Sequence, residues 1–223
     1  MSDLFRVALI IVIGYFIIST PHAPPITLPG NLFIENCDTV NTSIWAIANP
    51  NCDYPTANGG TWIFHYPAST ETFILPMTEQ KFQYGSYEAR IKMSGPKPNS
   101  QRYYFYLIDN NGAGSTYGEL DMFEVNYWEQ RESVSNYRGF SAKGEYYTPT
   151  INYDDGQWHT WKFIFTPTVE RIYIDNILQY TITETNPKIF PEYPMNLKIG
   201  GYNNGSVNQD FTLWVDWIKY TPI

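Results

Sequence analysis

The chain has 223 residues, which is enough for one large domain with a sizeable core. Its formal net charge of -8 at pH 7 disfavours a nucleic-acid partner, because such partners select basic surfaces. Aromatic residues make up 17% of the chain. They favour strands and also stack on sugar rings, so the composition agrees with a β fold and with a sugar-binding surface.

The N-terminus carries an apolar run over residues 7–18, preceded by Arg6. The run is shorter than the roughly 20 residues of a comfortable membrane span, and no clean cleavage site follows it. We therefore expect residues 1–20 to be a signal peptide or an N-terminal membrane anchor, followed by a Pro-rich linker over residues 21–30. Either case predicts a secreted or membrane-anchored protein whose domain, residues 31–223, lies outside the cytoplasm.

Two cysteines, Cys37 and Cys52, lie early in this domain. In an exported protein they predict a disulfide, which would contribute on the order of 3 kcal/mol to stability. The alternative is a pair of buried thiols. Neither case suggests a catalytic role for them.

Strand-like segments alternate with turns along the domain, for example from Gly60 to Met93. The alternation is interrupted by Pro and Gly, and no helical stripe occurs outside the N-terminus. This pattern predicts an all-β, antiparallel sandwich.

Three carboxylates stand among large apolar residues in one strand-like run: Glu119, Asp121 and Glu124. Glu119 and Asp121 share a face because side chains alternate along a strand, whereas Glu124 would point the other way. A bulge at Met122 or Phe123 would return Glu124 to the shared face. Two glutamates with an aspartate between them suit retaining glycoside hydrolysis. The alternative is an edge strand whose acidic residues face solvent.

The run Glu119–Glu124 resembles the ExDxxE signature of glycoside hydrolase family 16, in the form of its laminarinase, agarase and carrageenase branches. Other segments resemble the same family in the same order and together cover roughly Leu32 to Tyr220. These segments are Tyr84–Met93, Tyr153–Phe165, Arg171–Asn176, Pro194–Gly201 and Thr212–Tyr220.

The resemblance implies a jelly-roll sandwich of two antiparallel sheets, with a concave sugar-binding cleft. It implies a retaining, endo-acting hydrolase or transglycosylase of a β-linked polysaccharide such as a β-1,3-glucan. Glu119 would be the nucleophile, Glu124 the general acid and base, and Asp121 the residue that tunes Glu119. No organic cofactor is implied, and we expect a monomer whose partner is the polysaccharide.

The sequence departs from the family pattern in the strand expected to line the cleft. Tyr106 stands where the family has a tryptophan, and Tyr104 stands at a small residue. Tyr104, Tyr106 and Trp128 are the candidates for stacking sugar rings, with core packing as the alternative for Trp128. These changes leave open a second hypothesis, a non-catalytic carbohydrate-binding or surface-coat protein on the same fold.

Two further positions need an interpretation. His159 could be mistaken for a catalytic base, but no cluster of other histidines or cysteines supports a metal site, so we expect a structural role. In some relatives an aspartate matching Asp216 binds calcium together with an acidic residue near Glu35. The resemblance therefore implies a structural calcium at Asp216 and Glu35, which oxygen ligands would suit.

Overall fold

The computed structural model describes residues 31–47, 51–94, 101–109, 118–126, 131–138, 141–147, 149–184, 190, 193–205 and 209–223. The expected signal or anchor segment, the linker and Trp128 lie outside these residues. Within the described ranges every regular element is a β-strand, and no helix is long and apolar enough to cross a membrane.

The strands, in chain order, are β1 (Phe33–Glu35), β2 (Trp45–Ile47), β3 (Thr56–Ala57), β4 (Trp62–Tyr66), β5 (Glu71–Ile74), β6 (Pro76–Phe82), β7 (Gly85–Ser94), β8 (Gln101–Asp109), β9 (Gly118–Asn126), β10 (Arg131–Arg138), β11 (Ser141–Tyr147), β12 (Trp158–Phe165), β13 (Val169–Ile174), β14 (Ile177–Thr183), β15 (Met195–Asn204) and β16 (Phe211–Pro222).

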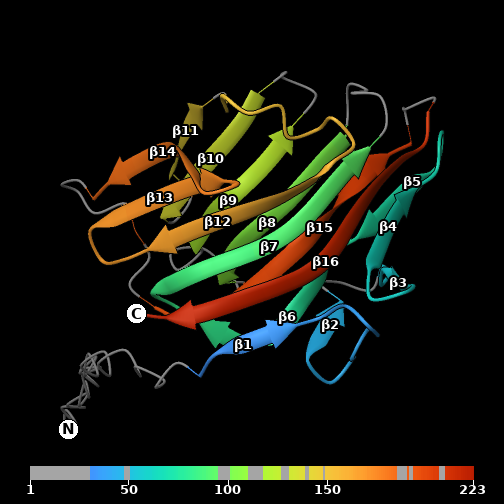
Figure 1. Ribbon diagram of the computed structural model, residues 1–223, viewed down its shortest axis with the longest axis horizontal. Coiled ribbons are helices and arrows are strands. Elements are labelled where there is room, and N and C mark those ends of the chain that lie inside the picture. The colour runs from blue at the N-terminus through green and yellow to red at the C-terminus, as the bar shows by residue number, and fades with distance from the viewer. Residues whose placement is uncertain are drawn as a thin grey trace, which may run out of the picture.

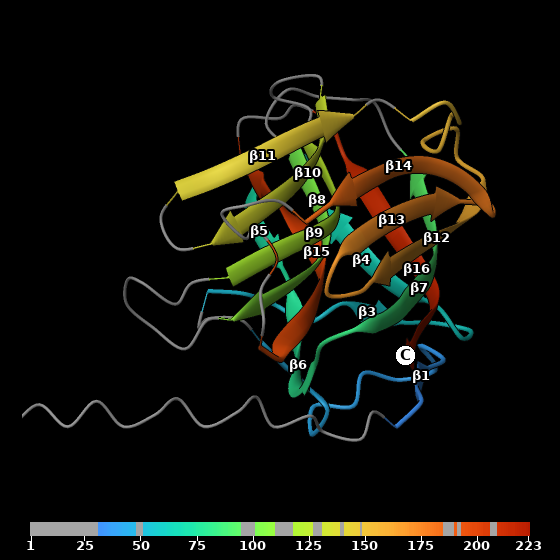
Figure 2. The ribbon, with the colours of Figure 1, turned by 90° about the vertical axis from the view of Figure 1, so that its left-hand side faces the viewer.

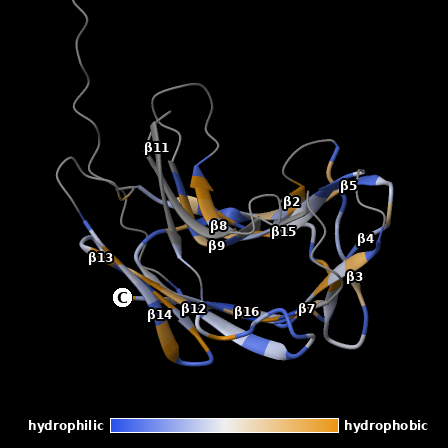
Figure 3. Ribbon diagram, turned by 90° about the horizontal axis from the view of Figure 1, so that it is seen from above, coloured by the Kyte–Doolittle hydropathy of each residue, from blue (hydrophilic) through white to orange (hydrophobic). Residues whose placement is uncertain are grey.

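The strands form two eight-stranded antiparallel sheets stacked face to face (Figure 1). One sheet has the order β14-β13-β12-β7-β16-β4-β3, with β1 paired to β16. The other has the order β11-β10-β9-β8-β15-β6-β2, with β5 paired to β15. Both sheets curve in the same sense, so the outer face of the second sheet is concave (Figure 3). We call them the convex and the concave sheet; the predicted sandwich is confirmed.

Alternating aromatic residues build the core between the sheets. Trp62, Phe64 and Tyr66 of β4 are fully buried, and the residues between them are not. Across the sandwich, Phe123 of β9 packs on Trp161 of β12 with ring centroids 4.7 Å apart. Each such pair stabilises the packing beyond the area it buries.

One edge of the sandwich is closed by a stacked tyrosine pair. β11 and β14 lie on the same side of the molecule in two perpendicular views (Figures 1 and 2). Tyr147 of β11 stacks on Tyr180 of β14, with centroids 5.1 Å apart and the ring planes 7° from parallel. The pair therefore joins the edge strands of the two sheets.

The predicted disulfide is wrong, because no bond joins Cys37 and Cys52. Burial raises the pKa of the Cys37 thiol far above its usual value, and the thiol hydrogen bonds to the backbone of Trp62. Cys52 instead lies close enough to Tyr66 to affect its pKa.

Gly200 lets two strands of the concave sheet approach each other. Its φ of +137° lies in a region that L side chains rarely adopt, and a Cβ there would come within 2.0 Å of the Ile74 carbonyl oxygen. The backbone at the end of β5 therefore packs directly against β15, which only glycine allows.

Substituting Gly200 by alanine should destabilise the fold by at least about 3 kcal/mol, since strain and a backbone collision add. Gly156→Ala is the matched control: its φ is +80°, but a Cβ there meets nothing within 4 Å. The control should cost about 1–2 kcal/mol. Urea unfolding of both variants measures the difference, and equal losses would show that the collision is relieved at no cost.

Candidate active site

The strand that carries the carboxylates contains the predicted bulge. Phe105 of β8 lies opposite Phe123 of β9, but the next residue, Tyr106, lies opposite Asp121. Met122 is therefore the extra residue of β9. Met122 and Phe123 are both buried on the core side of the strand.

The bulge brings the three carboxylates to one face of the concave sheet. The register pairs Glu119 with Ile108, Asp121 with Tyr106 and Glu124 with Tyr104. Directly opposite residues of an antiparallel pair share a face. The residues between them on β8, Phe105 and Leu107, belong to the core, so the carboxylates lie on the outer, concave face.

The three carboxylates differ in their exposure. Asp121 is fully buried, Glu124 is 9% exposed, and Glu119 is only partly buried. Burial disfavours the charged form of a carboxylate, and neighbouring carboxylates disfavour each other's ionisation. The arrangement is therefore suited to holding one carboxyl protonated while another stays ionised.

Aromatic rings extend from this site across the concave face. Tyr104 is nearly parallel to Tyr202 of β15, with centroids 6.4 Å apart and 19° between the planes. Tyr202 in turn lies 5.4 Å from Phe73 of β5, at 17°. Tyr106 is only 6% exposed and makes an edge contact with Tyr104 at 5.4 Å. Tyr104 thus belongs to a row of rings, whereas Tyr106 is mostly covered.

Tyr202, Phe73 and Lys198 also lie on this face, although no sequence motif indicated them. Lys198 lies opposite Tyr106 in the pairing of β15 with β8, and its Nζ is 5.7 Å from the centre of that ring. Burial lowers the pKa of Lys198, and the charge of Glu119 only partly opposes this shift. A lysine within the otherwise apolar run of β15 was the available signal.

Asp216 and Glu35, the residues predicted to hold calcium, have hydrogen-bond partners within the protein. Asp216 Oδ2 accepts a hydrogen bond from Arg90 at 2.5 Å. The two carboxylate oxygens of Glu35 accept hydrogen bonds from the backbone N–H of Cys37 and from the indole of Trp45, both at 3.0 Å. Across the described ranges, no group of three or more acidic, histidine or cysteine residues is placed to hold a metal.

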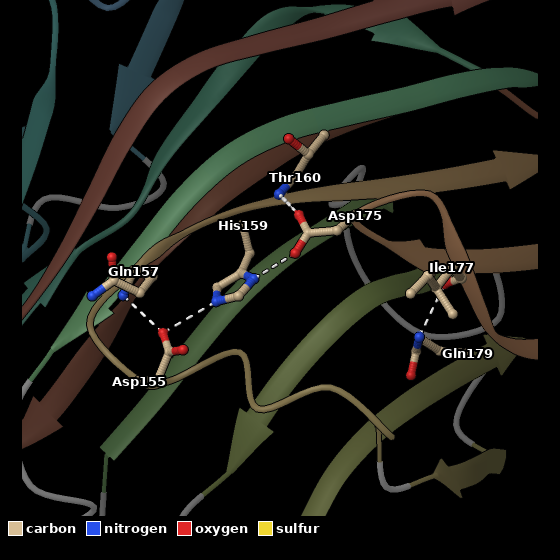
Figure 4. Close-up of polar contacts among 7 residues, drawn as sticks. All are labelled: Asp155, Gln157, His159, Thr160, Asp175, Ile177 and Gln179. Carbon is tan, nitrogen blue, oxygen red and sulfur yellow. Dashed lines mark hydrogen bonds and ion pairs between the residues drawn. The ribbon is translucent and has the colours of Figure 1, made fainter.

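His159 lies in the convex sheet, between two aspartates (Figure 4). Its Nδ1 is 2.7 Å from Asp175 and its Nε2 is 3.2 Å from Asp155. Asp175 also accepts a hydrogen bond from the backbone N–H of Thr160 at 2.8 Å. The ring thus ties the turn after β13 to the start of β12, which supports the structural role predicted for His159.

The fold and the site together define a β-sandwich that carries a carboxylate trio on a bulged strand of its concave sheet. The sequence pattern of Glycosyl hydrolases family 16 matches residues 56–219. The chain belongs to this family. No curated protein matches the chain in sequence.

Solved structures of similar fold are glucan-degrading enzymes of low sequence identity. A β-glucanase from Bacillus licheniformis has a TM-score of 0.67 and 19% identity, covering 87% of this chain and 99% of its own. The laminarinase catalytic domain from Thermotoga maritima MSB8 has a TM-score of 0.68 and 14% identity, covering 86% and 97%. A family 16 endo-glucanase from Bacteroides ovatus has a TM-score of 0.67 and 16% identity, covering 85% and 99%.

The ring of His159 should stabilise the protein in a defined pH window. Burial lowers the pKa of His159, but hydrogen bonds to Asp175 and Asp155 outweigh it, so the pKa rises above its ordinary 6.5. Hydrogen bonds from Gln157 and His159 lower the pKa of Asp155 below its ordinary 3.8. The stabilisation is therefore fully present between about pH 4 and pH 6.5, and is lost as pH rises through the raised histidine pKa.

The melting temperature of His159→Gln, measured from pH 4 to pH 9, should fall furthest below the wild type near pH 5–6. The gap should narrow above the raised pKa. A gap that does not change with pH would contradict the ion-pair account of this cluster.

Proposed function

We propose that the protein is a retaining, endo-acting glycoside hydrolase that cleaves a β-linked polysaccharide on its concave face. The observation that carries this proposal is the bulge at Met122, which turns Glu119, Asp121 and Glu124 to one face. Membership of family 16 supports it.

The spacing of the carboxylates suits the retaining reaction. The β8 partners of Glu119 and Glu124 are four residues apart, so the two glutamate Cα atoms are separated by about 13 Å along the strands. Two glutamate side chains that lean toward each other across Asp121 can bring their carboxyls near the 5 to 5.5 Å of retaining enzymes.

In the first step the Glu119 carboxylate attacks the anomeric carbon and forms a glycosyl ester. The glycosidic C–O bond breaks as the Glu124 carboxylic acid gives its proton to the leaving oxygen. In the second step the Glu124 carboxylate takes a proton from water, and the resulting hydroxide attacks the ester and frees Glu119. Asp121, buried between them, shares a proton with the nucleophile and holds it in place. The two steps need no organic cofactor.

The row formed by Tyr104, Tyr202 and Phe73 supports an extended substrate, because rings on three strands can contact more than one sugar. The structurally similar enzymes are named for β-glucan and laminarin substrates. We therefore propose a β-1,3- or mixed-linkage glucan backbone as the first substrate to test.

Glu119→Gln should lower the release of reducing ends from β-glucans and β-galactans by about 10³-fold or more, because the amide cannot form the ester. It should bind the same polymers as tightly as the wild type. The control is Glu88→Gln, which makes the same charge change on the outer face of the convex sheet and should leave turnover unchanged.

The first product released by the wild type should keep the β-configuration in a proton NMR time course. An inverted first product would rule out the covalent step. If the wild type releases no sugar but binds the polymers, the protein is a carbohydrate-binding protein on this fold and the proposed hydrolysis is wrong.

A further inference from the structure

The ammonium of Lys198 is buried, and the protein compensates only part of the cost of burying its charge. The side chain is 4% exposed. Within the part of the chain that the structure describes, its ammonium has no ion pair within 4 Å and no side-chain hydrogen bond. It lies 5.7 Å from the centre of the Tyr106 ring, and the charge of Glu119 offsets its burial only in part. An ammonium removed from water without a partner costs several kcal/mol.

Three other lysines of the described chain have partners. Lys81, also in the concave sheet, lies 3.1 Å from Asp109. Lys92 of the convex sheet lies 4.4 Å from the ring of Trp214, and Lys219 is 3.8 Å from Glu88. Lys198 is more deeply buried than Lys81, whose side chain is 30% exposed, and yet it has less compensation.

Lys198 points to the same face as the carboxylates. Lys198 pairs with Tyr106, and Tyr106 pairs with Asp121, so the three residues form one row across β15, β8 and β9. Two strand spacings separate Lys198 from Asp121, about 10 Å. The charge of Glu119 acts on the ammonium, so Lys198 lies beside the proposed reaction site on the face that would hold the polysaccharide. Tyr202 lies on the same face of β15, four residues further along the strand.

We propose that Lys198 is a specificity-determining residue that binds an oxyanion on the polysaccharide, either a sulfate ester or a carboxylate. This inference rests on the proposed function for the face on which the sugar lies. It narrows the substrate class from any β-linked polysaccharide to one that carries acidic substituents.

The chemistry of the site favours an anion over a neutral hydroxyl. A buried ammonium regains the energy of its lost hydration only from an opposite charge with which it forms charge-assisted hydrogen bonds. The chain carries a net charge of -8, and three carboxylates line the same face, so a polyanion would be repelled without a local cation. Lys198 supplies this cation on the concave face, beside the ring of Tyr106.

The test uses Glu119→Gln protein, so that binding is measured without turnover. The probes are laminarin and agarose, each in neutral, sulfated and carboxymethylated form. Binding of each probe is compared with that of Glu119→Gln/Lys198→Met, in which a methionine of similar length replaces the ammonium. Glu119→Gln/Lys162→Met is the control: it removes the same charge from the outer face of the convex sheet.

The Glu119→Gln protein should bind one acidic form at least about tenfold more tightly than the neutral form of the same polymer. The sulfated and carboxymethylated arms show which oxyanion it takes. Lys198→Met should abolish the preference and leave neutral binding within about twofold, whereas Lys162→Met should change neither. Equal binding of acidic and neutral forms, an equal loss for both in Lys198→Met, or no binding of any acidic form would overturn the inference.

A stability measurement separates a binding role from a structural one. Burial lowers the pKa of Lys198, so the folded state disfavours its charge. The melting temperature of Lys198→Met should therefore equal or exceed that of its parent. A clear fall would show that the ammonium is a structural partner of the carboxylates and would overturn the inference.

The two proposals can fail separately. If the wild type hydrolyses these polymers but the Glu119→Gln protein binds acidic and neutral forms equally, the proposed hydrolysis is supported and the inference of an acidic substrate is wrong. If no polymer is cleaved but an acidic polymer binds through Lys198, the proposed hydrolysis is wrong and the proposed binding of an acidic ligand is supported.

Discussion

The contact between Phe123 and Trp161 is the constraint on which the site depends. Phe123 lies beside the extra residue of β9, and both Phe123 and Met122 point into the core. Two successive residues on one face break the alternation of the strand. The ring centroids of Phe123 and Trp161, which belong to opposite sheets, are 4.7 Å apart. Core packing therefore holds the bulge in place, independently of the residues on the concave face. Everything C-terminal to the bulge changes face, including Glu124.

The two outer faces of the sandwich treat their charges differently. On the convex sheet, Arg90 pairs with Asp216 across β7 and β16, and Lys92 lies over the rings of both Trp158 and Trp214. These groups compensate each other at the surface and contribute little to stability. On the concave sheet, carboxylates and an ammonium are buried where charge is costly. Buried charged groups destabilise the fold, and the aromatic core compensates for this cost. Such an arrangement is typical of binding sites and active sites.

The aromatic core also explains how the fold persists at low sequence identity. The solved structures compared above share only 14–19% of their residues with this chain. Alternation of large apolar residues is enough to direct each strand face inward, and many combinations of rings fill the space. The concave face tolerates fewer amino-acid changes than the core, because its carboxylates and aromatic rings must be of particular residue types. Tyr106 and Tyr104, which stand where the resemblance predicts a tryptophan and a small residue, change that face while the sandwich is kept.

The sequence by itself determined the sandwich and the face of the three carboxylates. The alternation of apolar and polar residues predicts strands. The spacing of Glu119, Asp121 and Glu124 requires a bulge to bring all three side chains to one face, and the structure has this bulge at Met122. Both results depend on residues close in sequence.

Only the tertiary structure decided what surrounds them. Lys198 and Tyr202 reach the site because β15 pairs with β8, far apart in the chain, and Phe73 joins them through β5. The tertiary structure also overturned the predicted disulfide, since Cys37 and Cys52 are both buried as free thiols. Lateral neighbours in a sheet follow from strand order, and strand order is set by how the whole core packs rather than by any local pattern of residues.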